Sequence, residues 1–158
     1  MINNLLSLNI GGQIFALPLE KIVNLIQKPN TKTEQGDDGL PMLKVEFNGI
    51  NIPIYNISLY TGKKNTTLLK NGYVVIIETS INNAQKLIGV HIDEMPEVIE
   101  VDDYEMFPYP KISETYPCFI AEALICHEGN EITLLDIDCM FNKDKMRLKS
   151  NQGQLLLL

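Results

Sequence analysis

Apolar and polar residues alternate along much of this chain, most clearly near its beginning. Between residues 6 and 10 the apolar side chains are separated by Ser7 and Asn9, the period-two pattern of a strand with one buried face. Gly11-Gly12 then offers two residues that tolerate a positive φ, as a tight hairpin turn requires. A second short apolar segment follows from Gln13 to Leu17. The pattern therefore predicts a β-hairpin.

The period of the pattern changes after this hairpin. Pro18 fixes φ and lacks an N–H, so it suits the first position of a helix. The apolar residues after it recur at the i, i+3, i+4 and i+7 positions of an amphipathic helix, namely Leu19, Ile22, Val23 and Ile26. We therefore expect one short helix across the end of the hairpin. Leu25 is a fifth apolar position outside this stripe, and an exposed apolar patch there would mark a protein–protein site.

The middle of the chain predicts a second hairpin between polar segments. Asn48-Gly49, a strong signal for a type I′ turn, separates the predicted strands Met42–Phe47 and Ile50–Ile54. Pro53 cannot donate a ladder hydrogen bond, so we expect its strand to lie at a sheet edge or to leave its N–H side unpaired. The flanking segments predict a loop, a helical turn and a second loop, at Lys28–Gly39, Ile57–Tyr60 and Lys63–Gly72.

Short strands also dominate the second half of the chain. Tyr73–Ile77 has no polar face and predicts a central, covered strand, and Gly89 within the strand Lys86–Ile92 indicates a bulge or a close backbone approach. The remaining predictions are strands at Glu97–Val101, Phe119–Cys126 and Glu131–Ile137, an irregular connection at Asp102–Pro117 and a helix at Met140–Lys149. About nine short strands with hairpin turns indicate an all-β fold, either one barrel or a pair of small barrels.

Composition narrows the functional classes. The chain has 158 residues and a formal net charge of −7, which suits one compact unit or two small subdomains. The acidic balance argues against nucleic acid and anionic membrane surfaces as partners, because both bind through Lys and Arg. The chain shows no secretory signal and no apolar run near the ~20 residues of a membrane span. Three cysteines without metal-ligand spacing indicate reduced thiols in a cytoplasmic protein.

The chain carries no recognisable catalytic constellation. His91 and His127 are far apart, and neither they nor the cysteines have the spacing of a zinc site. The pair Asp136 and Asp138 fits a helix N-cap, with Asp138 bonding backbone N–H groups, better than a metal site. No set of residues provides a nucleophile, a base and an orienting group. We therefore expect no enzyme activity, no catalytic residue, no metal and no cofactor.

Four segments together resemble the CheW-like domain family of chemotaxis coupling proteins. GGQIFALPLEKIVNLI is similar to the opening hairpin and helix of that family, and NGINIPIYNISLYTG to its RG-x-x-x-P-V-V-D-L segment. KLIGVHIDEMPEVIEV resembles the G-x-x-V-D-x-V-x-x-V element, and EITLLDIDCMF the closing strand. The four segments occur in the family's order and span nearly the whole chain.

The resemblance implies a fold of two intertwined five-stranded barrels of the Src-homology-3-like kind, with short helices. We expect one domain over residues 1–158. Its two subdomains would be roughly 14–85 and 86–142, the second completed by the N-terminal strand, and a C-terminal helix and tail would follow over 140–158.

The resemblance also implies a non-catalytic adaptor of bacterial chemosensory arrays. Such proteins couple methyl-accepting chemoreceptors to the histidine kinase CheA, by binding the receptor's cytoplasmic tip and the kinase's regulatory domain. By motif position, Ile22 would lie in the receptor-facing groove, and Asn24 and Leu25 at the kinase-facing end of the helix. The other implied contact residues are Leu19, Asn48 and Asn56. We expect a monomer when the protein is free.

Three departures from the family pattern keep alternatives open. Asn24, Asn48 and Asn56 occupy positions at which the family usually has a charged residue. A divergent scaffold for a non-motility pathway therefore fits as well as a flagellar coupling protein. A small-ligand-binding barrel would need a cavity of ~300 Å³ or more. A flavin-dependent split-barrel enzyme would need cationic or backbone groups for phosphate, and Arg147 is the only arginine.

Overall fold

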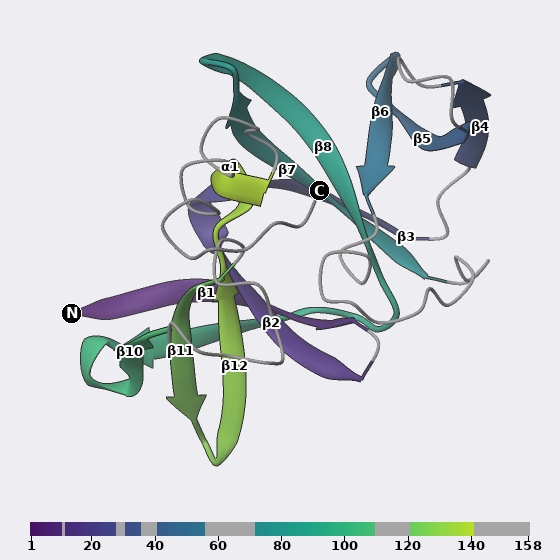
Figure 1. Cartoon of the computed structure of the whole chain (residues 1–158). Helices are drawn as coiled ribbons and strands as arrows, with labels where there is room; N and C mark the ends of the chain where they lie inside the picture. The colour runs from purple at the N-terminus through teal and green to yellow at the C-terminus, as the bar shows by residue number, and fades with distance from the viewer. Residues whose placement is uncertain (11, 28–30, 36–40, 56–71, 110–120, 141–158) are drawn as a thin grey trace.

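The computed structural model describes residues 1–10, 12–27, 31–35, 41–55, 72–109 and 121–140 (Figure 1). Within these ranges the chain forms two sheets of six strands each, so the predicted all-β class is confirmed. The first sheet has the spatial order β10 (Met106–Pro108), β11 (Ala121–His127), β12 (Asn130–Leu135), β2 (Gln13–Pro18), β1 (Ile2–Ile10), β9 (Glu97–Asp102). The second has the order β3 (Ile22–Gln27), β7 (Tyr73–Ile81), β8 (Ala84–Ile92), β6 (Ile50–Tyr55), β5 (Pro41–Phe47), β4 (Thr31–Gln35).

Tight turns set the register of these sheets. Asn48 and Gly49 have φ of 51° and 77°, the two positive values that the predicted type I′ turn requires. The β11–β12 turn likewise has positive φ at Glu128 and Gly129, and the β7–β8 turn at Asn82-Asn83. Most neighbouring strands are antiparallel, whereas β12–β2 and β6–β8 are parallel.

A hydrophobic core shared by both sheets holds the molecule together. We call it the central core, and it buries residues of β1, β2, β7, β8, the end of β12 and α1 (Ile137–Met140). Each sheet also has a smaller core of its own, one around Ile125 and Val101 in the first sheet and one around Ile52 and Val74 in the second. The central position predicted for Tyr73–Ile77 is confirmed, because residues 74–77 are completely buried.

The helix predicted after Pro18 is wrong. A single 3₁₀ turn, η1 (Leu19–Lys21), is followed at once by the extended strand β3. The strand pairs with β7, and its register shifts between Ile22 and Asn24, so Val23 is the extra residue of a β-bulge. The bulge lets Ile22 and Leu25, three positions apart, pack against the same central core. This strand therefore imitates the spacing of a helix.

Two other predictions need correction. The segment predicted as a loop at Lys28–Gly39 contains β4, and the connection after Asp102 contains the 3₁₀ turn η3 (Asp103–Glu105) and β10. Of the two arrangements expected for Pro53, the edge strand is wrong because β6 is internal, and the unpaired N–H side agrees with a β6–β8 pairing that begins at the next residue, Ile54. The predicted helical turn at 57–60, the loop at 63–71 and most of the helix at 140–149 lie outside the described residues.

The two sheets use different parts of the chain. Strands β3 to β8, from Ile22 to Ile92, all belong to the second sheet. The expected subdomain ranges, 14–85 and 86–142, stay a prediction. The first sheet is assembled from both ends of the chain, since β1 and β2 join β9 to β12. The chain thus crosses from the first sheet to the second at η1 and returns after β8.

A close contact, and not a bulge, accounts for Gly89. Its strand pairs in regular register with β7, but a Cβ at this position would lie 2.8 Å from Cγ1 of Val74 and 3.4 Å from Cγ1 of Ile54. Both neighbouring side chains are buried, so neither has room to move aside. Glycine at this position allows β6, β7 and β8 to pack tightly.

A polar cluster ties the crossing point η1 to β7 and α1. Nζ of Lys21 lies 2.8 Å from Oδ2 of Asp138, while Oδ1 of Asp138 accepts hydrogen bonds from the Thr79 hydroxyl and, at 3.2 Å, from the Ser80 N–H. The N-cap of α1 is Asp136 and not Asp138, because Oδ1 of Asp136 accepts the Cys139 N–H at 3.1 Å. We call Lys21, Thr79, Ser80 and Asp138 the Asp138 cluster.

The charge state of the Asp138 carboxyl determines how much this cluster contributes to stability. Partial burial would raise the pKa of its carboxyl, but the hydrogen bonds from Lys21, Thr79 and Ser80 and the charge of Lys21 outweigh it, so the pKa is lowered. The folded state thus favours the carboxylate. Its contribution to stability is complete above the carboxyl pKa of the unfolded chain, ~3.9, and is lost as pH falls through the lower folded value.

We expect Gly89→Ala to destabilise the fold by ~1–3 kcal/mol, because the added methyl overpacks a dense interior. Chemical denaturation measures the loss. The double variant Gly89→Ala/Val74→Ala removes the opposing methyl groups, so its loss should be smaller than the sum of the two single losses. An unchanged midpoint for Gly89→Ala would show that the site has room for a side chain.

We expect Asp138→Asn to cost ~1 kcal/mol at neutral pH, a value reduced for the partial exposure of the ion pair. The difference from the wild type should shrink as pH falls below ~4, because the carboxyl is protonated first in the unfolded chain and then, at the lower folded pKa, in the native protein. Urea denaturation across this pH range provides the measurement. Glu46→Gln is the matched control, since its ion pair with Lys32 is long and exposed and should contribute little. A pH-independent difference would contradict this account.

Candidate functional site

The candidate site is the segment that crosses between the sheets, η1 and β3, which we call the crossing segment. Pro18 has φ of −57° and ψ of 129°, and Ile22 is already extended at φ −82° and ψ 124°. Between them only one turn of 3₁₀ helix fits. Lys21 anchors this turn through the Asp138 cluster, so the start of β3 is fixed from the second sheet and from α1.

The crossing segment divides its apolar side chains between the interior and the surface. Leu19, Ile22 and Leu25 are half-buried against the central core, and Ile26 against the smaller core of the second sheet. Val23, the bulge residue, is 43% exposed. An exposed valine beside half-buried leucine and isoleucine makes a small apolar surface at a strand that is, among the described strands, the outermost of its sheet.

Asn24 lies next to Val23 on this exposed part of β3. Its Oδ1 accepts the N–H of the following residue, Leu25, at 2.7 Å. A side chain that accepts its neighbour's backbone N–H is held close to its own strand. The asparagine therefore presents a short, uncharged side chain at the strand edge, where a glutamate would present a charge.

A cleft of about 670 Å³ opens on the first-sheet side of η1. Leu19 and Glu20 form one wall, and β1, β2, β10, β11 and β12 supply the rest. The other lining residues are Ile2, Asn3, Asn4, Leu5, Pro18, Met106, Glu122 and Leu134. The lining thus mixes apolar and polar side chains, with carboxylates at Glu20 and Glu122, and it suits a group that combines an apolar part with positive charge.

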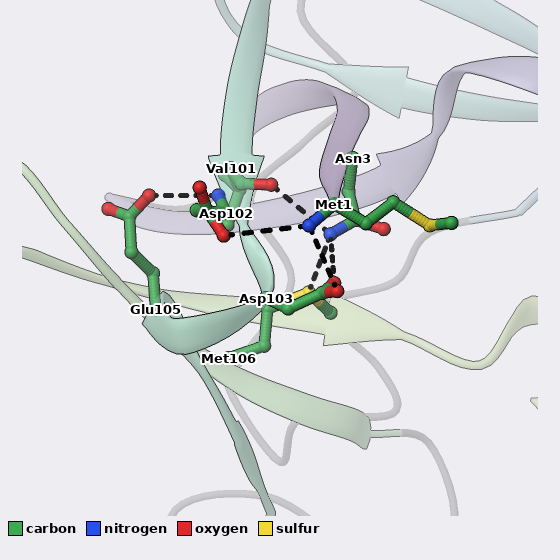
Figure 2. Close-up of polar contacts among 7 residues, drawn as sticks. All are labelled: Met1, Asn3, Val101, Asp102, Asp103, Glu105 and Met106. Carbon is green, nitrogen blue, oxygen red and sulfur yellow. Dashed lines mark hydrogen bonds and ion pairs between the residues drawn. The ribbon is translucent and has the colours of Figure 1, made fainter.

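A polar network around η3 joins β1 to β9 in the first sheet (Figure 2), and it includes Asn3, which also lines the cleft. Nδ2 of Asn3 donates to Oδ1 of Asp103 at 2.8 Å and to the Val101 carbonyl at 3.1 Å. Only 16% of the His127 side chain is exposed, and its Nδ1 lies 2.9 Å from Oε2 of Glu105. Hydrogen bonds from the Asp102 N–H and from His127 lower the pKa of Glu105.

The structure brings together four of the six residues expected to contact partners. Leu19, Ile22, Asn24 and Leu25 all lie on the crossing segment. Asn48 is exposed at the β5–β6 turn, and β7 and β8 separate its hairpin from β3 within the sheet. Asn56 lies outside the described residues. The role of all six in partner binding stays a prediction.

Sequence reasoning missed Val23, Lys21 and the cleft. The pattern placed Val23 in the apolar stripe of a helix, and only the bulge in β3 shows that it is exposed. Lys21 is paired with a carboxylate near the other end of the chain, and a single sequence gives no signal for such a pair. The walls of the cleft come from six elements in two separate parts of the chain, so no local sequence pattern predicts the cleft.

The described residues contain no group of three or more His, Cys, Asp or Glu side chains that could hold a metal ion. Within the same residues, no helix is long and apolar enough to cross a bilayer. What the crossing segment offers is apolar and amide surface, which suits contact with another macromolecule rather than bond-making chemistry.

Comparisons with known proteins agree with this arrangement. The family model of the CheW-like domain matches residues 4–145. No curated protein matches the sequence. Among solved structures, the chain is similar to the scaffolding protein TtCheW from Thermoanaerobacter tengcongensis, with a TM-score of 0.69 and 15% identity over 86% of this chain and 90% of that one.

The similarity to TtCheW concerns the fold, and it confirms the expected architecture of two Src-homology-3-like subdomains. Each described sheet has six strands, one more than the resemblance implied. The family match spans nearly the whole chain, including the crossing segment, both sheets and α1. The chain therefore belongs to the CheW-like domain family.

Proposed function

We propose that this protein is a non-catalytic adaptor that couples methyl-accepting chemoreceptors to a CheA-type histidine kinase. The observation that carries the proposal is the bulged edge strand β3, which exposes Val23 and Asn24 while Ile22 and Leu25 anchor it in the central core. Of these four residues, Ile22, Asn24 and Leu25 are ones that the family resemblance implies as partner contacts, and Val23 is an addition from the structure. The match to the family and the described scaffolding role of TtCheW support it.

The physical character of β3 suits the kinase's regulatory domain, itself a CheW-like domain. An edge strand with one exposed β-branched residue and an uncharged neighbour can bury apolar surface without desolvating a charge. The same chemistry serves a non-motility pathway equally well, because nothing about an apolar strand edge selects the pathway. The adaptor would act in the cytoplasm as a monomer that assembles with kinase and receptor.

The cleft beside η1 is the observation that favours the alternative function, a barrel that binds a small ligand. Its volume of about 670 Å³ lies within the range of small-molecule sites. In the coupling proposal this cleft faces a receptor side chain instead. Leu19 belongs to both the cleft and the crossing segment, so a partner seated on the crossing segment would reach the cleft as well.

Val23→Glu and Asn24→Arg should leave folding within about ±0.5 kcal/mol of the wild type, because both positions are exposed. Each should weaken binding to the regulatory domain of the cognate kinase about tenfold or more, since a charge would be desolvated at an apolar contact. Thermal midpoint and affinity are measured on the same samples. By contrast, Ile22→Glu places a charge against the central core and should lower the midpoint strongly.

Tyr104→Glu is the matched control for these variants. Tyr104 is 77% exposed on η3, an element that is not part of the crossing segment, and its variant should bind the kinase domain normally. Stable Val23→Glu and Asn24→Arg proteins with wild-type affinity would remove the crossing segment from the kinase contact. A small molecule that binds the cleft while neither kinase nor receptor binds the protein would favour the alternative.

Binding to the kinase domain should depend only modestly on salt. The proposed contact is apolar, and exposed charge pairs at its rim contribute ~1 kcal/mol or less. Titrations at low and at physiological ionic strength measure the dependence. A steep loss of affinity with salt would place the contact on charged residues instead, such as Asp37, Asp38, Lys63 and Lys64.

A further inference from the structure

We propose that the outer edge of β9 binds a basic, extended segment of a partner protein as an added antiparallel strand. Among the described strands, β9 is the outermost of the first sheet, with β1 on its inner side. This edge belongs to a different sheet from the crossing segment, so the proposal does not rest on the coupling function.

Backbone geometry decides which groups β9 turns outward. Strands β1 and β9 are antiparallel, and the Asp103 N–H donates to the Met1 carbonyl at 3.2 Å. Because antiparallel ladders alternate residue by residue, the odd-numbered residues of β9 bond to β1 and the even-numbered residues face away from it. The outward N–H and C=O groups therefore belong to Val98, Glu100 and Asp102.

One of these outward groups is already capped. Oε1 of Glu105 accepts the Asp102 N–H at 3.0 Å, as Figure 2 shows at the end of the strand. This bond closes the β9 edge at η3 and leaves the N–H and C=O of Val98 and Glu100 as the ladder for a new strand. A segment of about six residues matches the length of β9.

Side chains along this edge combine apolar surface with acid. Val98 is 60% exposed, and it shares one strand face with Glu100, while Glu97 and the half-buried Ile99 lie on the other. The sequence between Lys86 and Lys111 contains seven Asp or Glu residues and no Lys or Arg: Asp93, Glu94, Glu97, Glu100, Asp102, Asp103 and Glu105.

This charge pattern selects the occupant. If a second copy of the chain paired with β9 edge to edge, the Asp and Glu side chains of the two strands would lie opposite each other. Like charges in that position destabilise a strand pair. Nucleic acids and anionic membranes are repelled in the same way. A strand with lysines opposite Glu97, Glu100 and Asp102 gains cross-strand attraction in addition to backbone hydrogen bonds.

The probe is a fluorescently labelled peptide with the core Lys-Val-Lys-Val-Val-Lys. Aligned antiparallel to β9, its lysines stand opposite Asp102, Glu100 and Glu97, and its valines opposite the apolar residues. The decisive comparison is the same peptide with N-methyl groups at its third and fifth positions, opposite Glu100 and Val98. Methylation removes the two N–H donors that a new strand needs and keeps the charge.

We expect saturable binding of the unmethylated peptide at concentrations below about 1 mM, and a loss of affinity of about tenfold or more on methylation. In the protein, Val98→Pro removes an outward N–H without breaking a bond to β1, and should have the same effect. Glu100→Lys should weaken binding, whereas Glu131→Lys, an equal charge change at an exposed position of β12, should not.

Equal affinity for the methylated and unmethylated peptides would overturn the proposal. The peptide would then bind through its charge alone and would not add a strand to the sheet. No saturable binding up to about 1 mM would overturn it as well. If Val98→Pro lowers the thermal midpoint, the peptide pair still decides the matter on the wild-type protein. The Val98→Pro variant should bind the kinase regulatory domain with wild-type affinity. Failure of this proposal is therefore distinguishable from failure of the coupling function.

Discussion

The central core is the constraint on which the rest of the structure depends. Leu8 and Phe15 of the first sheet and Val75 and Val90 of the second are almost completely buried in it, so the two sheets cannot separate without exposing a large apolar area. Such burial is the main favourable term in folding. The chain reaches the second sheet only through η1, and the core therefore determines where the crossing segment lies and which of its side chains remain outside.

Sequence reasoning predicted the parts of the fold that depend on neighbouring residues. Alternation and positive-φ turn residues located the hairpin at Asn48-Gly49, and the uninterrupted apolar run located β7. It failed at β3 because a bulge adds one residue to the strand. Ile22 and Leu25 then face the same core at a helical spacing. Pairing with β7 decides the structure there, and a single sequence does not show the pairing.

The same limit applies to the candidate site. Leu19, Ile22, Asn24 and Leu25 were predicted together as contact residues and do lie together, yet the exposed residue beside them, Val23, was not among those predicted. Anchoring of the segment depends on Asp138, a residue far away in the chain. Local patterns thus identified the segment but not its orientation, because orientation is set by long-range contacts.

Hydrogen exchange in the presence and absence of the cognate kinase regulatory domain tests the central claim most directly. The claim is that β3 is an edge strand whose outer side meets a partner. On complex formation, backbone amides of residues 19–27 should exchange more slowly, while those of β4, the opposite edge of the same sheet, should keep their rates. Protection confined to β4, or no change at residues 19–27 in a saturated complex, would contradict the account.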